Sequence, residues 1–302
     1  MMSTVGHRQA DPPPAQVTRF YGNVDYALDV ISNLQITFTH VSTLNDPFDP
    51  HLILETDFQE KRSVLPNYVK DNHPEKLIQF KKFCTNSRWN ESINTLKKQL
   101  EDLKKTLFIL STIAKDGEQL PKDNLYMWSH YGNGHRGVAI EFDSRALGDS
   151  AIKYHGSQNG TAFGPERIWE KVAYCSRLPI ISAKDFYDFL SKPLGDRDHV
   201  LSSNNGIEQY LKLMARVKCD VWRNENEWRL IWENSDTRTK IQRFPISADS
   251  VVAVYLGLNI RESAREDFSF EANKKFPKVA VYQAIKRHGA FALDFERLSL
   301  TK

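Results

Sequence analysis

The chain has 302 residues, of which 40% are hydrophobic, 11% aromatic and 26% charged, and its formal net charge is +3. These fractions are ordinary for a globular protein with a packed core, and the length allows one large domain or two modest ones. The mild charge neither demands nor excludes a nucleic-acid partner, because such binding depends on clustered basic residues.

The cysteines and the apolar runs exclude further classes. Cys84, Cys175 and Cys219 form no C-x-x-C pair and have no zinc-ligand spacing, so we expect a reducing compartment and neither a disulfide framework nor a structural zinc. The longest apolar run, VVAVYLGL from Val251, has the length of a strand and not of a membrane span. We therefore expect a cytoplasmic protein without a membrane partner.

Residues 1–16 contain three consecutive prolines and no apolar signal core, which predicts a disordered lead-in. The alternating or β-branched segments that follow predict strands, and apolar residues three and four apart predict helices. Strands are expected at 17–22, 34–40, 106–113, 137–142, 169–176, 226–232, 250–258, 278–285 and 291–300. Helices are expected at 23–33, 182–192, 207–220 and from about 261.

Residues from about 57 to 105 are charged and helical in pattern, which predicts a helical insertion between strands. The Gly- and Asn-rich stretch from Tyr154 to Gly164 is typical of a long loop. We expect one α+β domain over residues 17–302, with a mixed, mostly antiparallel sheet and this insertion.

Three stretches concentrate polar residues that a fold does not need. LNDPFDP, at 44–50, is most simply a turn, because Asn, Asp and Pro are turn-forming residues. MWSHYGNGHRGVAIEFD, at 127–143, places His130 beside aromatic residues and a Gly-rich turn. That composition suits either a well-packed corner or a site for a polar ligand.

The third stretch is WRNENEWRLIW, at 222–232. Alternation along a strand puts Trp228 on one face, and Glu227 and Arg229 on the other. Glu225 lies two residues before Glu227, so an extended segment would present both carboxylates on one side. A solvated surface ladder is the simplest interpretation, and an acidic catalytic edge is the alternative.

Together these stretches resemble a prokaryotic family known as domain of unknown function 2971. The resemblance covers nearly the whole chain after residue 17, and the Trp-Ser-His-Tyr and Glu-x-Glu-Trp-Arg segments carry most of it. The corresponding positions are Arg19 with Tyr21, Asn45 to Phe48, Leu110 with Ser111, Trp128 to Tyr131, and Glu225 to Arg229. The family label implies no activity.

The order of these motifs is similar to that of the ADP-ribosyltransferase superfamily, which implies a split sheet and NAD as the substrate. By this resemblance Glu227 is the catalytic carboxylate, Glu225 positions the acceptor, and Ser111 shapes the nicotinamide pocket. The residues implied to bind NAD are Arg19, Tyr21, Asn45, Asp46, Trp128, His130, Tyr131 and Arg229. A fixed carboxylate lowers the barrier electrostatically as positive charge builds on the sugar, and Arg suits a pyrophosphate.

The resemblance implies an effector that modifies a protein or nucleic-acid acceptor or hydrolyses NAD, in a phage-defence or toxin setting, with a regulatory or antitoxin partner. One alternative is a metal-dependent nuclease in which Asp46, Asp49, His130, Glu225 and Glu227 gather around a divalent cation. Another is a non-catalytic module that senses a nucleotide.

The ADP-ribosyltransferase interpretation makes a specific structural prediction. The segment from Trp128 to Tyr131 should form one wall of a nucleotide pocket, and the turn from Gly132 to Gly137 should bring backbone to the ligand. His130 and Glu227 should then lie near each other across a cleft.

Overall fold

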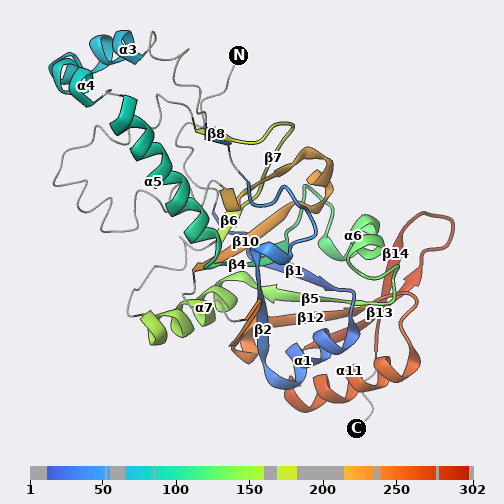
Figure 1. Cartoon of the computed structure of the whole chain (residues 1–302). Helices are drawn as coiled ribbons and strands as arrows, with labels where there is room; N and C mark the ends of the chain where they lie inside the picture. Colours follow the sequence, from blue (N-terminus) through green and yellow to red (C-terminus); the bar gives the residue numbers. More distant parts are fainter. Residues whose placement is uncertain are drawn as a thin grey trace.

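The structure is a computed structural model that describes residues 12–51, 53–54, 65–83, 86–159, 169–181, 214–233, 239–276 and 279–298. It has the expected α+β architecture, with a mostly antiparallel main sheet and seven α-helices within these ranges (Figure 1). Of the predicted lead-in, residues 1–11 lie outside the described residues.

The main sheet contains ten strands of the described chain. Its longest path runs β11-β2-β4-β1-β5-β12-β13-β14, while β10 pairs with β4 and β6. All these pairings are antiparallel except that of β12 with β13. The strand bounds, in chain order, are β1 Gln16–Tyr21, β2 Gln35–His40, β4 Leu107–Ile113, β5 Val138–Asp143, β6 Trp169–Lys171, β10 Glu227–Glu233, β11 Ile241–Pro245, β12 Val251–Leu256, β13 Ala280–Lys286 and β14 Leu293–Arg297.

The sheet splits along β4. All seven residues of β4 pair with β10 on one edge, so β1 and β2 must share the other edge. There β2 pairs with β4 at Phe108 and Ile109, and β1 pairs with it at Ile113. Between these contacts β1 and β2 separate, and the gap opens beside Leu110, Ser111 and Thr112.

Helices α1 (Val24–Asn33) and α11 (Glu262–Lys275) lie side by side against one face of the sheet (Figure 1). The side chain of Asn23 accepts a hydrogen bond from the Asp25 amide and so caps α1. The apolar side chains of both helices join the main core with the inward residues of the strands. A second, smaller core lies under α6 (Leu125–His130) and includes Phe20, Met127 and Trp128.

Three helices occupy the charged stretch that sequence periodicity assigned to an insertion: α3 (Leu65–Asn72), α4 (Leu77–Phe83) and α5 (Asn86–Lys104). Figure 1 shows α5 leading away from the sheet, with α3 and α4 at its far end. Helix α7 (Ser144–Asn159) follows β5 and packs against β11.

Two short strand pairs accompany the main sheet: β3 (Ile53–Leu54) with β8 (Ile180–Ile181), and β7 (Ala173–Cys175) with β9 (Val217–Cys219), both parallel. Single turns of 3-10 helix lie at Val41–Thr43, Pro74–Lys76, Pro121–Asp123 and Ala248–Ser250, and a longer one at Asp220–Glu225.

Most predicted strands are confirmed, and three assignments are wrong. Residues 217–219, expected within a helix, form β9, because their long-range pairing with β7 outweighs local periodicity. The segment 169–176 forms two strands in different sheets and not one. The expected loop at 154–164 is helical through Asn159, while residues 182–192 lie outside the described residues. Across the described ranges, no helix has both the length and the apolar character of a membrane span.

Candidate functional site

A cavity of about 200 Å³ opens where β1 and β2 separate along β4. It takes its walls from β1, β2, β4, β9, β10, the 3-10 helix before β10, the α6 region and the loop after β2. Its polar lining residues are Thr18, Arg19, Thr39, Thr43, Asn45, Asp49, Ser111, Thr112, Tyr131, Lys218, Glu225, Glu227 and Arg229.

Strand β10 supplies the charged floor of the cavity. Its Trp228, Leu230 and Trp232 enter the main core, so Glu227 and Arg229 face the other side, as alternation predicts. The expectation that these two charges form a solvated ladder is wrong. Glu227 is 3% exposed and Arg229 is 1% exposed, and buried charges must be paired to be tolerated.

Arg229 is paired on both sides of its guanidinium. Its Nε and Nη2 donate to the two carboxylate oxygens of Glu227 at 2.7 and 2.9 Å. Its Nη1 donates to Asp49 Oδ1 at 2.8 Å and to the Ala215 carbonyl at 2.6 Å, and Nη2 also donates to Asp49 Oδ2. The planar donor fork of Arg suits this double carboxylate contact. Asp49 thereby ties the loop after β2 to β10.

Lys218, on β9, joins the two glutamates. Its Nζ donates to Glu225 Oε2 at 2.7 Å and lies 3.4 Å from Glu227 Oε2. Glu225 belongs to the 3-10 turn before β10, and Asn226 between them has a left-handed φ of 43°. This turn, and not a shared strand face, brings the two carboxylates to one ammonium group.

The buried charges shift one another's protonation. Burial alone would raise the pKa of Glu227, but Arg229 and Lys218 more than offset it and hold that pKa at about 2. For Glu225 burial dominates the opposing attraction of Lys218, and its pKa is raised. Burial also raises the pKa of Asp49 in spite of Arg229. Glu227 is therefore the carboxylate most firmly held as an anion.

The low pKa of Glu227 predicts a specific acid sensitivity. A folded-state pKa of about 2 against an ordinary value of 4.5 means that ionised Glu227 stabilises the fold above about pH 4.5, and that this stability is lost as the pH falls toward 2. The difference in unfolding free energy between the wild type and Glu227→Gln should therefore shrink between pH 5 and 3. Urea unfolding at each pH measures it, and a pH-independent difference would contradict the assigned pKa.

Ser111 and Arg19 reach the cavity from β4 and β1. The Ser111 hydroxyl is a hydrogen-bonding partner of the Glu227 carboxylate. Arg19 spans the split itself, because its Nη1 donates to the Thr37 carbonyl of β2 at 2.7 Å. It is half-buried and lines the cavity, so part of its guanidinium remains available to an anionic ligand.

Helix α6 closes the opposite wall through Met127 and Tyr131. These residues are four apart, so a helix places them on one face. The Tyr131 hydroxyl donates to Glu225 Oε1 at 2.6 Å and accepts from Asn45 Nδ2 at 3.1 Å. Burial, followed by the charge of Glu225, raises the pKa of Tyr131, so it remains a neutral donor.

The remaining sequence-predicted residues do not line the cavity. Trp128 is fully buried, donates from Nε1 to the Lys122 carbonyl at 2.7 Å, and packs edge-on against Phe20. His130 is exposed, with its ring 4.2 Å from that of Tyr126. The wall expected from Trp128 to Tyr131 is thus made by Met127 and Tyr131, and Tyr131 takes the place expected for His130 beside the glutamates.

Two further residues from the predicted ligand set also lie outside the lining. Tyr21 is buried in the main core, with Arg19 over its ring at 5.3 Å. Asp46 is buried and accepts from the Phe48 amide at 2.9 Å, which makes it a turn-forming residue. Asp49, three residues later, is the carboxylate that reaches the cavity.

The Gly-rich turn serves packing and not ligand approach. A Cβ on Gly137 would lie 2.1 Å from the Tyr21 carbonyl, and one on Gly132 would lie 2.7 Å from the Trp128 carbonyl. Gly137→Ala should therefore lower the free energy of unfolding by about 1–3 kcal/mol, as overpacking does. Ser129→Ala, at an exposed position of α6, should stay within about 0.5 kcal/mol of the wild type. Equal stability of the two variants in urea unfolding would contradict this contact.

Sequence reasoning missed Lys218 and Tyr174, and it placed Asp49 only in the metal alternative. Tyr174, on β7, accepts a hydrogen bond at its hydroxyl from the Glu227 amide at 2.9 Å. Local sequence carries little signal for either residue, because both depend on the pairing of β7 with β9 across a long connection.

The cluster proposed for a divalent metal is not assembled. Asp49, Glu225 and Glu227 are hydrogen-bonded to Arg229 or Lys218, and neither His130 nor Asp46 lines their cavity. Among the described residues, no group of three His, Cys, Asp or Glu side chains is placed to hold a metal ion.

Comparison with curated proteins and with solved structures gives no match. Residues 127–230 match the family described as "Protein of unknown function (DUF2971)". The matched segment begins in α6 and ends within β10, so it contains Tyr131, Lys218, Glu225, Glu227 and Arg229. Over residues 127–230 the chain is thus similar to DUF2971, a family of proteins of unknown function.

Proposed function

We propose that the protein binds NAD at the split of its sheet and transfers ADP-ribose to an acceptor, or to water. The observation that carries the proposal is the meeting of three motif strands. Arg19 on β1, Ser111 on β4 and Glu227 on β10 come from distant parts of the sequence, yet these strands are neighbours and the three residues line one cavity. This matches the arrangement that the resemblance to ADP-ribosyltransferases implies, including a split sheet.

The size of the cavity limits what it can enclose. At about 200 Å³ it is smaller than the roughly 300–1,000 Å³ of pockets that bury drug-sized ligands. We assign the nicotinamide and its ribose to the cavity and the remainder of NAD to the mouth. Arg19 then provides a cation for the phosphates, and the ring of Tyr131 provides an aromatic surface for nicotinamide.

The chemistry follows from the charges. The bond between nicotinamide nitrogen and the ribose anomeric carbon breaks, both electrons leave with nicotinamide, and positive charge develops on the sugar. Glu227 supplies a fixed negative charge, since its pKa of about 2 keeps it ionised at neutral pH. The acceptor oxygen or nitrogen attacks the anomeric carbon and loses a proton. Glu225, whose pKa is raised, is the group we assign to take it.

A label-transfer experiment tests this function. Purified protein is incubated with NAD labelled in the adenylate phosphate, with and without cell lysate. Label that becomes protease-sensitive indicates a protein acceptor, and label that becomes nuclease-sensitive indicates a nucleic acid. Free ADP-ribose without lysate indicates hydrolysis. The effector role, a phage-defence or toxin setting and a restraining partner remain part of the proposal.

One observation favours a binding module as the second candidate. Both glutamates already have partners. Glu227 contacts Arg229 and Lys218. Glu225 is hydrogen-bonded to Tyr131 and Lys218. A site that only recognises a nucleotide needs this rigidity without turnover. A binding module predicts saturable NAD binding in calorimetry and no release of nicotinamide. A transferase predicts NAD binding together with release of nicotinamide.

A further inference from the structure

Strands β7 and β9 carry two adjacent cross-strand pairs. The parallel register places Tyr174 opposite Lys218, and Cys175 opposite Cys219. Successive side chains of a strand point to opposite faces. Tyr174 and Lys218 point to the glutamates, as their hydrogen bonds show, so the two cysteines share the other face.

The two thiols are within bridging range. Neighbouring strands lie about 4.8 Å apart, and register partners therefore fall within the Cα separation of about 4.4–6.8 Å that disulfides span. Both cysteines are free and half-buried. Their present contacts are weak ones: Cys175 Sγ donates to the Arg177 carbonyl and Cys219 Sγ approaches Asp220 Oδ1 at 3.6 Å.

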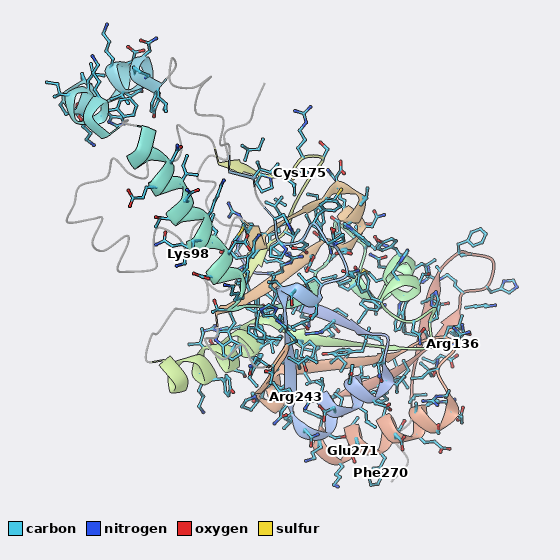
Figure 2. All side chains as sticks on the ribbon, viewed as in Figure 1. Lys98, Arg136, Cys175, Arg243, Phe270 and Glu271 are labelled. Atoms are coloured by element: carbon cyan, nitrogen blue, oxygen red, sulfur yellow. The ribbon has the colours of Figure 1, made fainter. Side chains whose placement is uncertain are left out.

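Their position makes them accessible. Figure 2 shows Cys175 at the periphery of the molecule, at the end opposite Phe270 and Glu271 of α11. The cysteines lie on the far side of β7 and β9 from the cavity, and neither lines it. A reagent can therefore reach the thiols without entering the candidate site.

We propose that Cys175 and Cys219 form a reversible disulfide when the protein meets a peroxide. One thiolate attacks the peroxide oxygen, giving a sulfenic acid and water. The second thiol attacks that sulfur, the S–S bond forms, and a second water leaves. Two thiols and one hydrogen peroxide thus give one disulfide and two waters. A dithiol reductant reverses the bridge by exchange, so it is transient in a reducing compartment.

The bridge has a direct consequence for the cavity. Disulfide Cβ atoms lie about 3.8 Å apart, which is closer than the spacing of neighbouring strands, so closure draws β7 and β9 together locally. These strands hold Lys218 against Glu225 and Tyr174 against the Glu227 amide. Oxidation therefore acts on the positioning of both glutamates, whether or not the site turns over NAD.

The test uses full-length protein carrying Cys84→Ser, since Cys84 lies outside the described residues. After treatment with hydrogen peroxide and removal of excess, thiol titration should show the loss of two thiols per chain. Mass spectrometry of a non-reducing digest should identify one peptide that joins Cys175 to Cys219. Dithiothreitol should restore both thiols.

The single variants Cys175→Ser and Cys219→Ser are the matched controls. Neither should form an intramolecular bridge, and each should remain folded because Ser preserves the side-chain size. The proposal is overturned if both thiols survive oxidation, if they oxidise independently to sulfinic acid, or if only cross-links between chains form. This assay contains no NAD, so its failure is distinct from failure of the proposed reaction.

Discussion

Arg229→Met is expected to lower the free energy of unfolding by about 3–5 kcal/mol, because removing one partner of a buried ion pair leaves charges uncompensated. Arg229 is 1% exposed and hydrogen-bonds to both Asp49 and Glu227, which are themselves 4% and 3% exposed. Lys218 reaches Glu227 but not Asp49 in these contacts. Without Arg229, Asp49 therefore loses its charged partner.

Equilibrium unfolding in urea at pH 7 measures this loss. Arg243→Met is the matched control, because Arg243 also lies on a strand, β11, but its side chain is 54% exposed and it sits 3.7 Å from Asp29. That variant should change stability by at most about 1 kcal/mol, as surface ion pairs do. Equal effects of the two substitutions would show that Arg229 is not a buried network residue in solution.

The loss of unfolding free energy in Arg229→Met relative to the wild type, here called the deficit, should also depend on pH. With the guanidinium gone, Asp49 and Glu227 both bind protons more readily in the folded protein than in the unfolded chain. The folded variant then gains stability as the pH falls through those raised pKa values. We expect the deficit at pH 7 to become smaller near pH 5. A deficit that stays constant would place its origin in packing and not in charge.

Glu227→Gln is expected to reduce the rate of nicotinamide release from NAD by about 100- to 1,000-fold, the scale of removing one electrostatic stabiliser of a transition state. Gln keeps the size of the side chain and removes the negative charge that faces the developing cation. Because the amide cannot stabilise that charge, the loss should fall on kcat more than on KM. NAD binding in calorimetry should persist.

The controls for Glu227→Gln separate chemistry from folding. Glu296→Gln removes a carboxylate at an exposed position of β14 and should leave the rate unchanged. Glu225→Gln should slow transfer to an acceptor more than it slows nicotinamide release, since Glu225 is assigned to the acceptor. If Glu227→Gln retains the wild-type rate while remaining folded by circular dichroism, Glu227 is not the catalytic carboxylate.

Much of the frame of the site could be predicted from local sequence. Strict alternation in NEWRLIW predicts β10 with Glu227 and Arg229 on one face, and the apolar run at 106–113 predicts the central strand that carries Ser111. These patterns are strong because one face of each strand must enter the core. Burial of the charged face could not be predicted, because it depends on Asp49 and Lys218 arriving from elsewhere in the chain.

The contribution of α6 to the cavity wall also could not be predicted from local sequence. The Trp-Ser-His-Tyr segment marks a special region, but its sequence does not say which side chains face the cavity. A single helical turn buries Trp128 in the second core, exposes His130 to solvent, and leaves Met127 and Tyr131 lining the cavity. The missing information was the direction from which α6 packs on the sheet, which is a tertiary property.

Whether the cavity supports NAD turnover is tested by the release of labelled nicotinamide from NAD by the purified wild-type protein, followed over time with and without cell lysate. We expect release that scales with protein concentration and that Glu227→Gln slows by about 100- to 1,000-fold. Saturable NAD binding with no release under either condition would leave a recognition module. If the protein neither binds NAD nor releases nicotinamide, the assignment of NAD to the cavity between β1, β2 and β4 is contradicted.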